Sequence, residues 1–338
     1  MTRGAFLGTL AGAAAAQAQQ RPPIRIAFLG ASHSHAADKI RIAGSSPDWE
    51  LVGVHEEDRV IQTPGVPRLS RDQVLNDKSI QAIAVESAVA RHESDALAAV
   101  EAGKHVHVEK PMAHTAAGLK KLDAAARARK RLVQSGYMWR YNPAVRLAME
   151  AARKGWLGEV YLVRGMMNTL VNDPERREEW GLFPGGQMFE QGSHLMDIVV
   201  RLMGRPLKVQ SVLRSHGPFE DGMKDNTVAI LEYKSALAII QASTLQPNAN
   251  AHRTLEIFGA NGNAVVRPIE PPSLEIDLAQ AAGPYHKGIQ KIVLHTYQRY
   301  VGDFQELAAA IRGERPLTAS LDEELMVHQT VLWVSEMA

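Results

Sequence analysis

The stretch that decides the fold is residues 24–35, which reads IRIAFLGASHSH. A short apolar run, residues 24–29, ends at Gly30, and a polar loop then leads into residues 36–43, where apolar side chains recur with helical spacing. We interpret this stretch as a strand, a glycine turn and a helix. The free amides and positive dipole at such a helix N-terminus are where dinucleotide pyrophosphates bind.

The same alternation continues through the first 140 residues. Further apolar runs typical of buried strands occupy residues 51–54, 80–85, 105–108 and 132–135. Helical patterns occupy residues 92–102, which stop at Gly103, and residues 116–129. Strands that alternate with helices of about a dozen residues indicate a doubly wound parallel sheet covered on both faces.

The glycine loop carries only part of the usual dinucleotide fingerprint, G-x-G-x-x-G. Gly30 is present, but Ser32 and His35 replace the second and third glycines. The loop alone therefore fits a plain strand-to-helix turn as well as a cofactor site. Under the cofactor interpretation, the candidate cofactor-binding residues are Gly30, Ser32, His33, Ser34 and His35.

An acidic residue follows the second predicted strand, where dinucleotide enzymes bind the adenosine ribose. Glu56 can accept hydrogen bonds from the ribose hydroxyls and repel a 2′-phosphate, which favours NAD over NADP. The alternative is an ordinary surface glutamate.

The histidines of the loop also allow a metal-binding interpretation. His33 and His35 have the residue type that ligates metals, but no third histidine lies nearby in the sequence. We therefore predict no metal site.

Length and charge narrow the class of protein. The 338 residues suggest two domains at roughly 150 residues each. Lys and Arg number 38 and Asp and Glu number 37, a net charge of +1, which argues against a nucleic-acid partner. The chain has no cysteine, so disulfides, zinc–thiolate sites and thiol nucleophiles are excluded.

The first twenty residues have the pattern of an export signal. Arg3 precedes an alanine-rich run, and Ala16-Gln17-Ala18 offers small residues at the positions read by a signal peptidase. The start resembles a twin-arginine signal, except that Gly4 stands where the second arginine belongs. We predict a periplasmic or secreted protein without a membrane segment in its mature form; the alternative is a cytoplasmic protein with an irregular N-terminus.

Two longer motifs carry a specific resemblance. Residues 102–111 read AGKHVHVEKP, and residues 185–197 read GGQMFEQGSHLMD. In this order they resemble the signatures of the glucose–fructose oxidoreductase/inositol dehydrogenase (Gfo/Idh/MocA) family of NAD(P)-dependent oxidoreductases. Residues 140–143, 155–160 and 297–312 also resemble family segments, so the resemblance covers roughly residues 24–335.

The resemblance implies a domain plan. After the export signal at 1–20 we expect a Rossmann-like dinucleotide-binding domain at 21–142. An α+β domain for substrate binding and oligomerisation is expected at 143–338. Successive strands at 160–164, 209–213, 227–233, 236–242 and 254–258 predict a large, mostly antiparallel sheet in this second domain. In the family one face of that sheet bears helices and the other forms dimers, so we expect a homodimer or homotetramer.

The resemblance also assigns catalytic roles. Lys110 follows a parallel strand at the sheet edge where α/β proteins bind ligands, and it would position the substrate hydroxyl or the nicotinamide ribose. Glu109 would hold that lysine or contact the cofactor. His194 would be the general base, and a four-residue spacing places Glu190 on the same helical face as His194. Glu190 stands where the family has Asp. We expect Asp197 to anchor residues of the site from behind or to form a salt bridge with Arg201.

One cofactor-binding loop departs from the family pattern. The third strand of the family ends in T-P-N, whereas here the residues are Ser87-Ala88-Val89, without the asparagine. His92 keeps the histidine that follows, so we count Ser87 and His92 among the cofactor-binding candidates. The intact Lys110 and His194 favour a modified site over a decayed one.

Aromatic and arginine side chains are candidates for the walls of a sugar site, because Tyr and Trp stack on sugar faces and Arg binds hydroxyls or carboxylates. Besides Glu190 and His194, the candidate substrate-binding residues are Tyr137, Trp139, Arg177, Trp180 and Tyr285, with Arg176 and His286 beside them.

These features predict an enzyme that oxidises a hydroxyl of a sugar, glycoside or cyclitol, with NAD as cofactor and NADP less favoured. An exported dehydrogenase has little free NAD to draw on, so we expect tightly held NAD and a redox-neutral cycle of glycosidase or elimination type. A plain sugar or cyclitol dehydrogenase is the alternative among enzymes. A non-catalytic sugar or dinucleotide sensor on the same fold is the alternative outside them.

Overall fold

The computed structural model describes residues 21–56, 63 and 65–338. The predicted export signal, residues 1–20, lies outside the described residues. Among the described helices, none is long and apolar enough to cross a membrane.

The first domain contains a parallel sheet in the order β2-β1-β3-β4-β5. The strands are β1 (Ile24–Leu29), β2 (Trp49–His55), β3 (Ala82–Val85), β4 (His105–Val108) and β5 (Val133–Ser135). The helices are α1 (Ala36–Ser45), α2 (Arg71–Asn76), α3 (Val89–Glu101) and α4 (Ala116–Arg129). The doubly wound parallel sheet is confirmed. Helix α4 has the predicted bounds, whereas α3 begins three residues earlier than predicted.

Buried side chains alternate along β1 between two apolar clusters. Ile26 and Phe28 face the larger cluster, which continues into the second domain, whereas Ala27 and Leu29 face a smaller cluster built with α3 and α4. This two-residue alternation shows that β1 is buried on both faces, as a central strand of a covered parallel sheet must be.

The second domain contains an eight-stranded sheet in the order β13-β12-β11-β10-β6-β9-β8-β7, in which only β6 and β9 pair in parallel. The strands are β6 (Val160–Asn168), β7 (Lys208–Arg214), β8 (Asn226–Glu232), β9 (Leu237–Ser243), β10 (Thr254–Gly259), β11 (Gly262–Val266), β12 (Leu274–Leu278) and β13 (Gly288–Lys291). The mostly antiparallel sheet is confirmed, with β11, β12 and β13 added to the five predicted strands.

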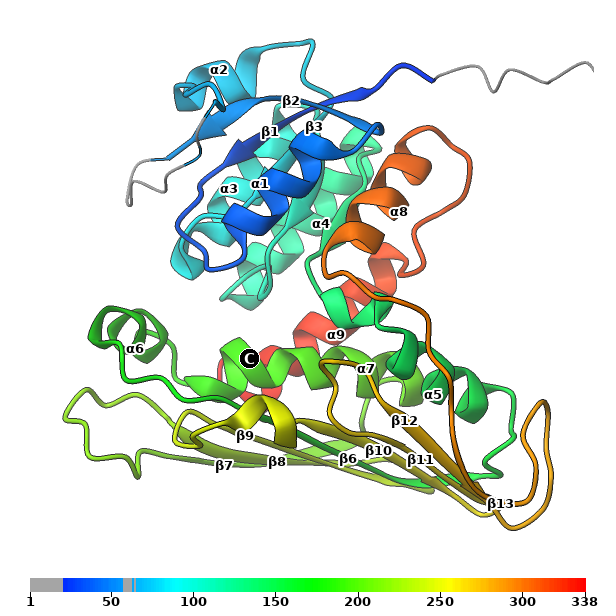
Figure 1. The fold of residues 1–338 in the computed structure, drawn as a ribbon. Helices are drawn as coiled ribbons and strands as arrows, with labels where there is room; N and C mark the ends of the chain where they lie inside the picture. Colours follow the sequence, from blue (N-terminus) through cyan, green and yellow to red (C-terminus); the bar gives the residue numbers. More distant parts are fainter. Residues whose placement is uncertain (1–20, 57–62, 64) are drawn as a thin grey trace, which may run out of the picture.

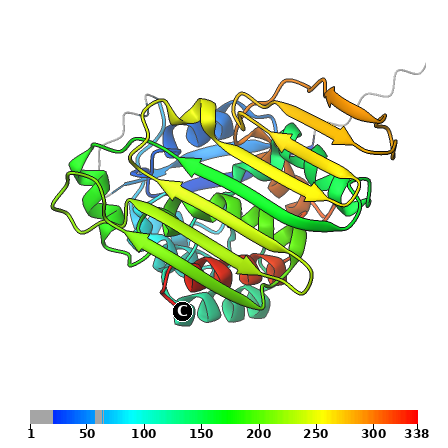
Figure 2. The ribbon, with the colours of Figure 1, turned by 90° about the horizontal axis from the view of Figure 1, so that it is seen from below.

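The remaining helices lie between the two sheets or beside them (Figure 1). They are α5 (Pro143–Arg153), α6 (Pro174–Gly181), α7 (Ser193–Met203), α8 (Val301–Ile311) and α9 (Leu321–Val334), with short turns at Met138–Tyr141 and Met188–Gly192. Helices α5, α7 and α9 lie on the upper face of the second sheet, and α8 and α9 return beside the first domain (Figure 1). Seen from below, the other face of that sheet has no helix in front of it (Figure 2).

Local sequence explains where the chain crosses into the second domain. Asn142 caps α5, since its side chain accepts hydrogen bonds from the amides of Ala144 and Val145, and Pro143 occupies the first helical position. The Asn142 amide also donates to the carbonyl oxygen of Ile269 at 2.8 Å, which ties this crossing to the loop after β11.

Candidate active site

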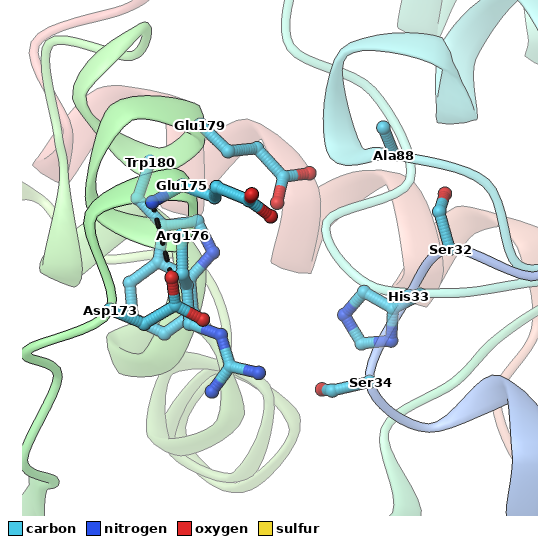
Figure 3. Close-up of a pocket in the computed structure, with 9 residues that line it drawn as sticks. All are labelled: Ser32, His33, Ser34, Ala88, Asp173, Glu175, Arg176, Glu179 and Trp180. Atoms are coloured by element: carbon cyan, nitrogen blue, oxygen red, sulfur yellow. Dashed lines mark hydrogen bonds between the residues drawn. The ribbon is translucent and has the colours of Figure 1, made fainter. Parts of the chain in front are cut away.

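The candidate site lies at the carboxyl ends of β1, β3 and β4, opposite the turn that leads into α7. A cavity of about 420 Å³ opens beside it, between the loop after β1 and helix α6. Figure 3 shows His33 and Ser34 on one side of this cavity and Arg176 on the other. Its lining residues are Ser32, His33, Ser34, Ala88, Asp173, Glu175, Arg176, Glu179 and Trp180.

The glycine turn brings β1 and β3 into close contact. Gly30 has φ +84°, and a Cβ atom at this position would lie 2.4 Å from the Cα of Ser87. Only glycine fits this approach without strain. The carboxylate of Glu56, after β2, accepts a hydrogen bond from the amide of Ala31, so the predicted ribose-binding acid reaches the same turn.

Lys110 and Glu190 form a buried ion pair across the two domains. The Lys110 ammonium donates to Glu190 Oε1 at 2.5 Å and to the Glu190 main-chain oxygen at 3.2 Å. Burial alone would raise the pKa of Glu190, but Lys110, followed by His33, outweighs it and holds this pKa well below its usual range. Glu190 is therefore a carboxylate in the folded protein.

His194 lies in an aromatic environment one turn beyond Glu190. The turn Met188–Gly192 is π-helical and α7 begins at Ser193, so the two residues span a helix junction and both are buried. The ring centres of Trp139 and His194 are 5.0 Å apart. Burial, followed by the charge of Lys110, lowers the pKa of His194 well below 6.5, which makes the imidazole neutral at pH 7.

Two buried polar atoms near this imidazole lack partners. Neither Nδ1 of His194 nor Nε1 of Trp139 has a hydrogen-bond partner among the described residues. A buried polar group without a partner is costly unless a ligand or water completes it, so both atoms are available to a ligand or a water.

A second buried charge cluster lies beneath the loop after β1. The ammonium of Lys39 donates to Glu86 at 2.7 Å and to Glu109, and it lies 2.9 Å from Nε2 of His107. Burial alone would lower the pKa of Lys39, but Glu109 and Glu86 outweigh it and raise this pKa. Burial raises the pKa of Glu86 to about 7 and lowers that of His107 to about 3.

The second oxygen of Glu109 faces the histidine loop. Glu109 Oε1 lies 3.2 Å from Nδ1 of His35, and Nε2 of His33 lies 3.6 Å from Glu190. Burial lowers the pKa of His35 to about 4. Burial would raise the pKa of Glu109, but Lys39, then His35 and His33, hold it well below 4.5. The structure thus places a carboxylate from a distant part of the sequence beside these two histidines.

A buried arginine network supports the site from the α9 side. The Arg140 guanidinium binds both oxygens of Asp197 at 2.6–3.1 Å and both oxygens of Glu324 at 2.5–2.8 Å. It also lies 5.1 Å from the ring centre of Tyr137. Asp197 is therefore an anchor paired with Arg140 on the turn Met138–Tyr141, and this pairing connects α7 and α9 to the residues that follow β5.

Comparison with known proteins now gives the family. Residues 24–137 match the family model described as "Oxidoreductase family, NAD-binding Rossmann fold", and residues 145–265 match "GFO/IDH/MocA C-terminal domain". The chain belongs to the GFO/IDH/MocA oxidoreductase family. The first domain is thus an NAD-binding Rossmann domain.

Individual relatives of this GFO/IDH/MocA protein are distant. The trans-1,2-dihydrobenzene-1,2-diol dehydrogenase of Bos taurus is 25% identical over 197 residues, which cover 58% of this chain and 57% of the relative. The uncharacterized oxidoreductase YhhX of Escherichia coli is 32% identical, over 52% of this chain and 50% of its own length. The chain thus spans only about half to three-fifths of these two relatives. The scyllo-inositol 2-dehydrogenase (NAD(+)) of Bacillus subtilis is 24% identical, over 88% and 90% of the two chains.

Solved structures agree on the fold. A crystal structure of GenD2 from gentamicin A biosynthesis, in complex with NAD, superposes with a TM-score of 0.78 at 21% identity and covers 94% of this chain and 95% of its own.

The residues at the sheet edge fit an NAD molecule. The tight turn at Gly30 and the carboxylate of Glu56 lie where the diphosphate and the adenosine ribose bind in Rossmann domains. The hydroxyl oxygens of Ser32 and Ser87 are buried and have no hydrogen-bond partner among the described residues, so both are available to a ligand.

Other predicted residues of the GFO/IDH/MocA protein lie near the site but are engaged elsewhere. Both ring nitrogens of His92 face carbonyl oxygens, of Pro111 and Ser87, each at 2.9 Å, so His92 ties the β3 loop to the segment after Lys110. The guanidinium of Arg177 is occupied by Asp221 and Asp225, with the ring of Phe219 3.7 Å away.

The two remaining wall residues lie at different places. Trp180 lines the cavity on α6, with Arg176 5.9 Å from its ring centre. Tyr285 packs against Trp156, on the segment between β12 and β13 at the far edge of the second sheet.

Sequence reasoning missed the charged residues that lie beneath and behind the site. Lys39 is fully buried on α1 together with Ala36, Ile40 and Ala43. The signal available in the sequence was that Lys39 stands three residues after Ala36, within a helical stripe that is otherwise apolar and therefore buried. Glu86, His107 and Glu324 gave no comparable signal, because their partners come from other elements of the fold.

Proposed function

We propose that this protein is an NAD-dependent oxidoreductase that oxidises a secondary hydroxyl of a sugar, glycoside or cyclitol. The single observation that carries the proposal is the convergence of Lys110, Glu190 and His194 at the carboxyl edge of the NAD-binding sheet. The similarity to a scyllo-inositol dehydrogenase over nearly the whole chain supports the substrate class.

Under this proposal, the chain supplies the acid–base chemistry and NAD, when bound, supplies the hydride acceptor. The ammonium of Lys110 donates a hydrogen bond to the substrate oxygen, while Glu190 fixes its position. The neutral imidazole of His194 accepts the hydroxyl proton. The alcohol loses a hydride and a proton and becomes a carbonyl.

His194 is suited to this role by its environment. A neutral imidazole can take a proton, and once charged it is disfavoured by burial and by Lys110, whereas the carboxylate of Glu190 favours it less strongly. The proton therefore leaves easily on the return step, which a reversible dehydrogenase requires.

We further propose that NAD stays bound through a redox-neutral cycle. In one form of this cycle the substrate carbon is oxidised, the proton next to the new carbonyl is lost, the leaving group on the next carbon departs, and the hydride returns to the carbonyl carbon. In the other form the hydride passes to a second sugar, which is reduced while the first stays oxidised. The predicted export signal supports this, since an exported enzyme has little free NAD to exchange. Gel filtration of natively purified protein tests it: retained nicotinamide, measured by mass spectrometry, is expected, and cofactor that washes out argues for a plain dehydrogenase.

The open face of the second sheet suits self-association. Large apolar side chains are exposed on the strands of this sheet, among them Tyr161 (52%), Val212 (53%) and Ile289 (66%). We propose a homodimer or homotetramer built on this face. Light scattering after gel filtration is expected to give two or four chain masses, and Val212→Lys is expected to shift the protein toward the monomer.

Turnover tests the main proposal. Wild-type protein with NAD is expected to oxidise at least one member of a panel of sugars, glycosides and cyclitols. NAD binding without turnover on the whole panel would instead favour a sugar or dinucleotide sensor.

A further inference from the structure

We propose that His33, His35 and Glu109 form a binding site for a divalent transition-metal cation, of which Zn²⁺ is the best match. The ligand atoms of these three residues all lie within 4.8 Å of one another. Two imidazole nitrogens and one carboxylate oxygen are a donor set that zinc sites with an open position use. This inference goes beyond the proposed oxidoreductase function.

The spacing of two donor atoms matches a tetrahedral metal. His35 Nδ1 and Glu109 Oε1 face each other at 3.2 Å. With zinc–nitrogen and zinc–oxygen bonds of about 2.0–2.1 Å, neighbouring ligand atoms in a tetrahedron lie about 3.3 Å apart. The two atoms are thus already at the separation of ligands that share one cation.

Within the described part of the chain, the two atoms have only each other as partners. Glu109 is fully buried, and apart from their mutual contact at 3.2 Å neither Glu109 Oε1 nor Nδ1 of His35 has a partner among the described residues. A buried carboxylate oxygen with a single polar contact can accept a further water or ion. A cation between these atoms would bind both of them together with His33.

The third ligand is held by its own loop. Nδ1 of His33 accepts a hydrogen bond from the amide of His35 at 3.3 Å, which leaves Nε2 as the nitrogen for the metal. The two rings meet edge to face with centres 4.6 Å apart. Nε2 of His33 also lies 3.6 Å from Glu190, so a cation here would have a second carboxylate within reach.

Lys39 explains why the cation belongs on this side of Glu109. Glu86, His107 and Glu109 form another group of close ligand atoms, but the ammonium of Lys39 already lies among them. This ammonium binds Glu109 Oε2 and so orients Oε1 toward His35. A hydrogen-bonded second oxygen is the usual support of a metal-ligating carboxylate.

The charges of the surroundings allow a divalent cation. The carboxylates of Glu86, Glu109 and Glu190 face two ammonium groups, those of Lys39 and Lys110. The acidic side chains of this buried group thus outnumber its ammonium groups by three to two before a cation enters. The open coordination position of a metal at this site suits an oxygen of a bound small molecule.

Metal titration of the full chain tests the site without turnover. The protein is first treated with a chelator and dialysed, then titrated with ZnCl₂ by calorimetry and with CoCl₂ by visible absorption. We expect one equivalent of each metal and the ligand-field bands of tetrahedral Co²⁺. His35→Gln and His33→Gln are each expected to weaken Zn²⁺ binding by about 100-fold or more and to remove the Co²⁺ bands.

The matched control is His295→Gln, which removes an exposed histidine and is expected to bind metal like the wild type. Circular dichroism and thermal unfolding show whether each variant is folded. Absence of stoichiometric binding to wild-type protein, or binding that a folded His35→Gln variant retains, would overturn the inference. NAD binding, followed separately by fluorescence in the metal-free protein, tells this failure from failure of the proposed function.

Discussion

The ammonium of Lys110, at the end of β4, donates two hydrogen bonds to Glu190, one to its carboxylate at 2.5 Å and one to its main-chain oxygen at 3.2 Å. The two residues are 80 positions apart and belong to different domains. This contact joins the NAD-binding sheet to the π-helical turn before α7, and it holds the ammonium near enough to His194 to lower the pKa of that imidazole.

Glu190→Gln tests how far the ion pair positions Lys110. The amide keeps the size of the side chain but removes the charge that holds the ammonium, so we expect kcat to fall about 10- to 100-fold. The Kd for NAD is expected to change less than twofold. Steady-state kinetics and NAD fluorescence titration measure the two effects, and an unchanged kcat would show that Glu190 does not position Lys110.

Cofactor choice depends on Glu56. Glu56→Ser removes the carboxylate next to the turn at Gly30, so the repulsion of a 2′-phosphate disappears. We expect NAD to bind about tenfold more weakly and NADP to bind more tightly than in the wild type. Glu50→Gln, on the exposed side of β2, is the control and is expected to leave both affinities unchanged. A Glu56→Ser variant with the wild-type preference would refute this role.

Stability of the interdomain network depends on Arg140. Arg140→Met leaves the carboxylates of Asp197 and Glu324 buried without a counterion, so we expect a loss of about 3–5 kcal/mol in the free energy of unfolding. Arg127→Met removes an exposed arginine that also binds two carboxylates, and it is expected to cost about 1 kcal/mol or less. Urea unfolding measures both. Equal losses of unfolding free energy in the two variants would show that the buried network of Arg140 is no more important for stability than an exposed ion pair.

Acid sensitivity is expected from His328. Burial lowers the pKa of this histidine to about 4, against about 6.5 in the unfolded chain. As the pH falls, the unfolded state therefore binds a proton at His328 before the folded state does. The contribution of His328 to the free energy of unfolding is complete above about pH 6.5 and is lost as the pH falls to about 4. The loss amounts to about 3 kcal/mol. Urea unfolding at several pH values is expected to show that the free energy of unfolding falls less steeply with decreasing pH in His328→Gln than in the wild type. Identical slopes in the two proteins would contradict this role of His328.

The sequence predicted the first sheet and the long motifs well because their signals are local. Strands such as β1 and β4 are continuous apolar runs, and helix α4 begins at the capping residue Thr115. Strands β11 and β12 were missed because the loop between them contains three prolines, Pro268, Pro271 and Pro272, which interrupt the alternating strand pattern.

The sequence predicted only those residues of the candidate site that lie within the two long motifs. Lys110, Glu190 and His194 belong to these motifs and come together in the structure. The cluster around Lys39 could not be foreseen, because its partners Glu86 and Glu109 are 47 and 70 residues away and directly follow two different strands, β3 and β4. Long-range pairing of buried charges has no periodic signature in a sequence.

Transient reduction of NAD, followed at 340 nm in a stopped-flow instrument, tests the central claim most directly, because it detects hydride transfer in a net oxidation and in a redox-neutral cycle alike. With an oxidisable sugar or cyclitol, wild-type protein is expected to reduce bound NAD, and Lys110→Ala and His194→Ala are expected to bind NAD normally but reduce it about 100- to 10,000-fold more slowly. Wild-type rates in both folded variants, or no reduction by wild-type protein with any substrate of the panel, would contradict it.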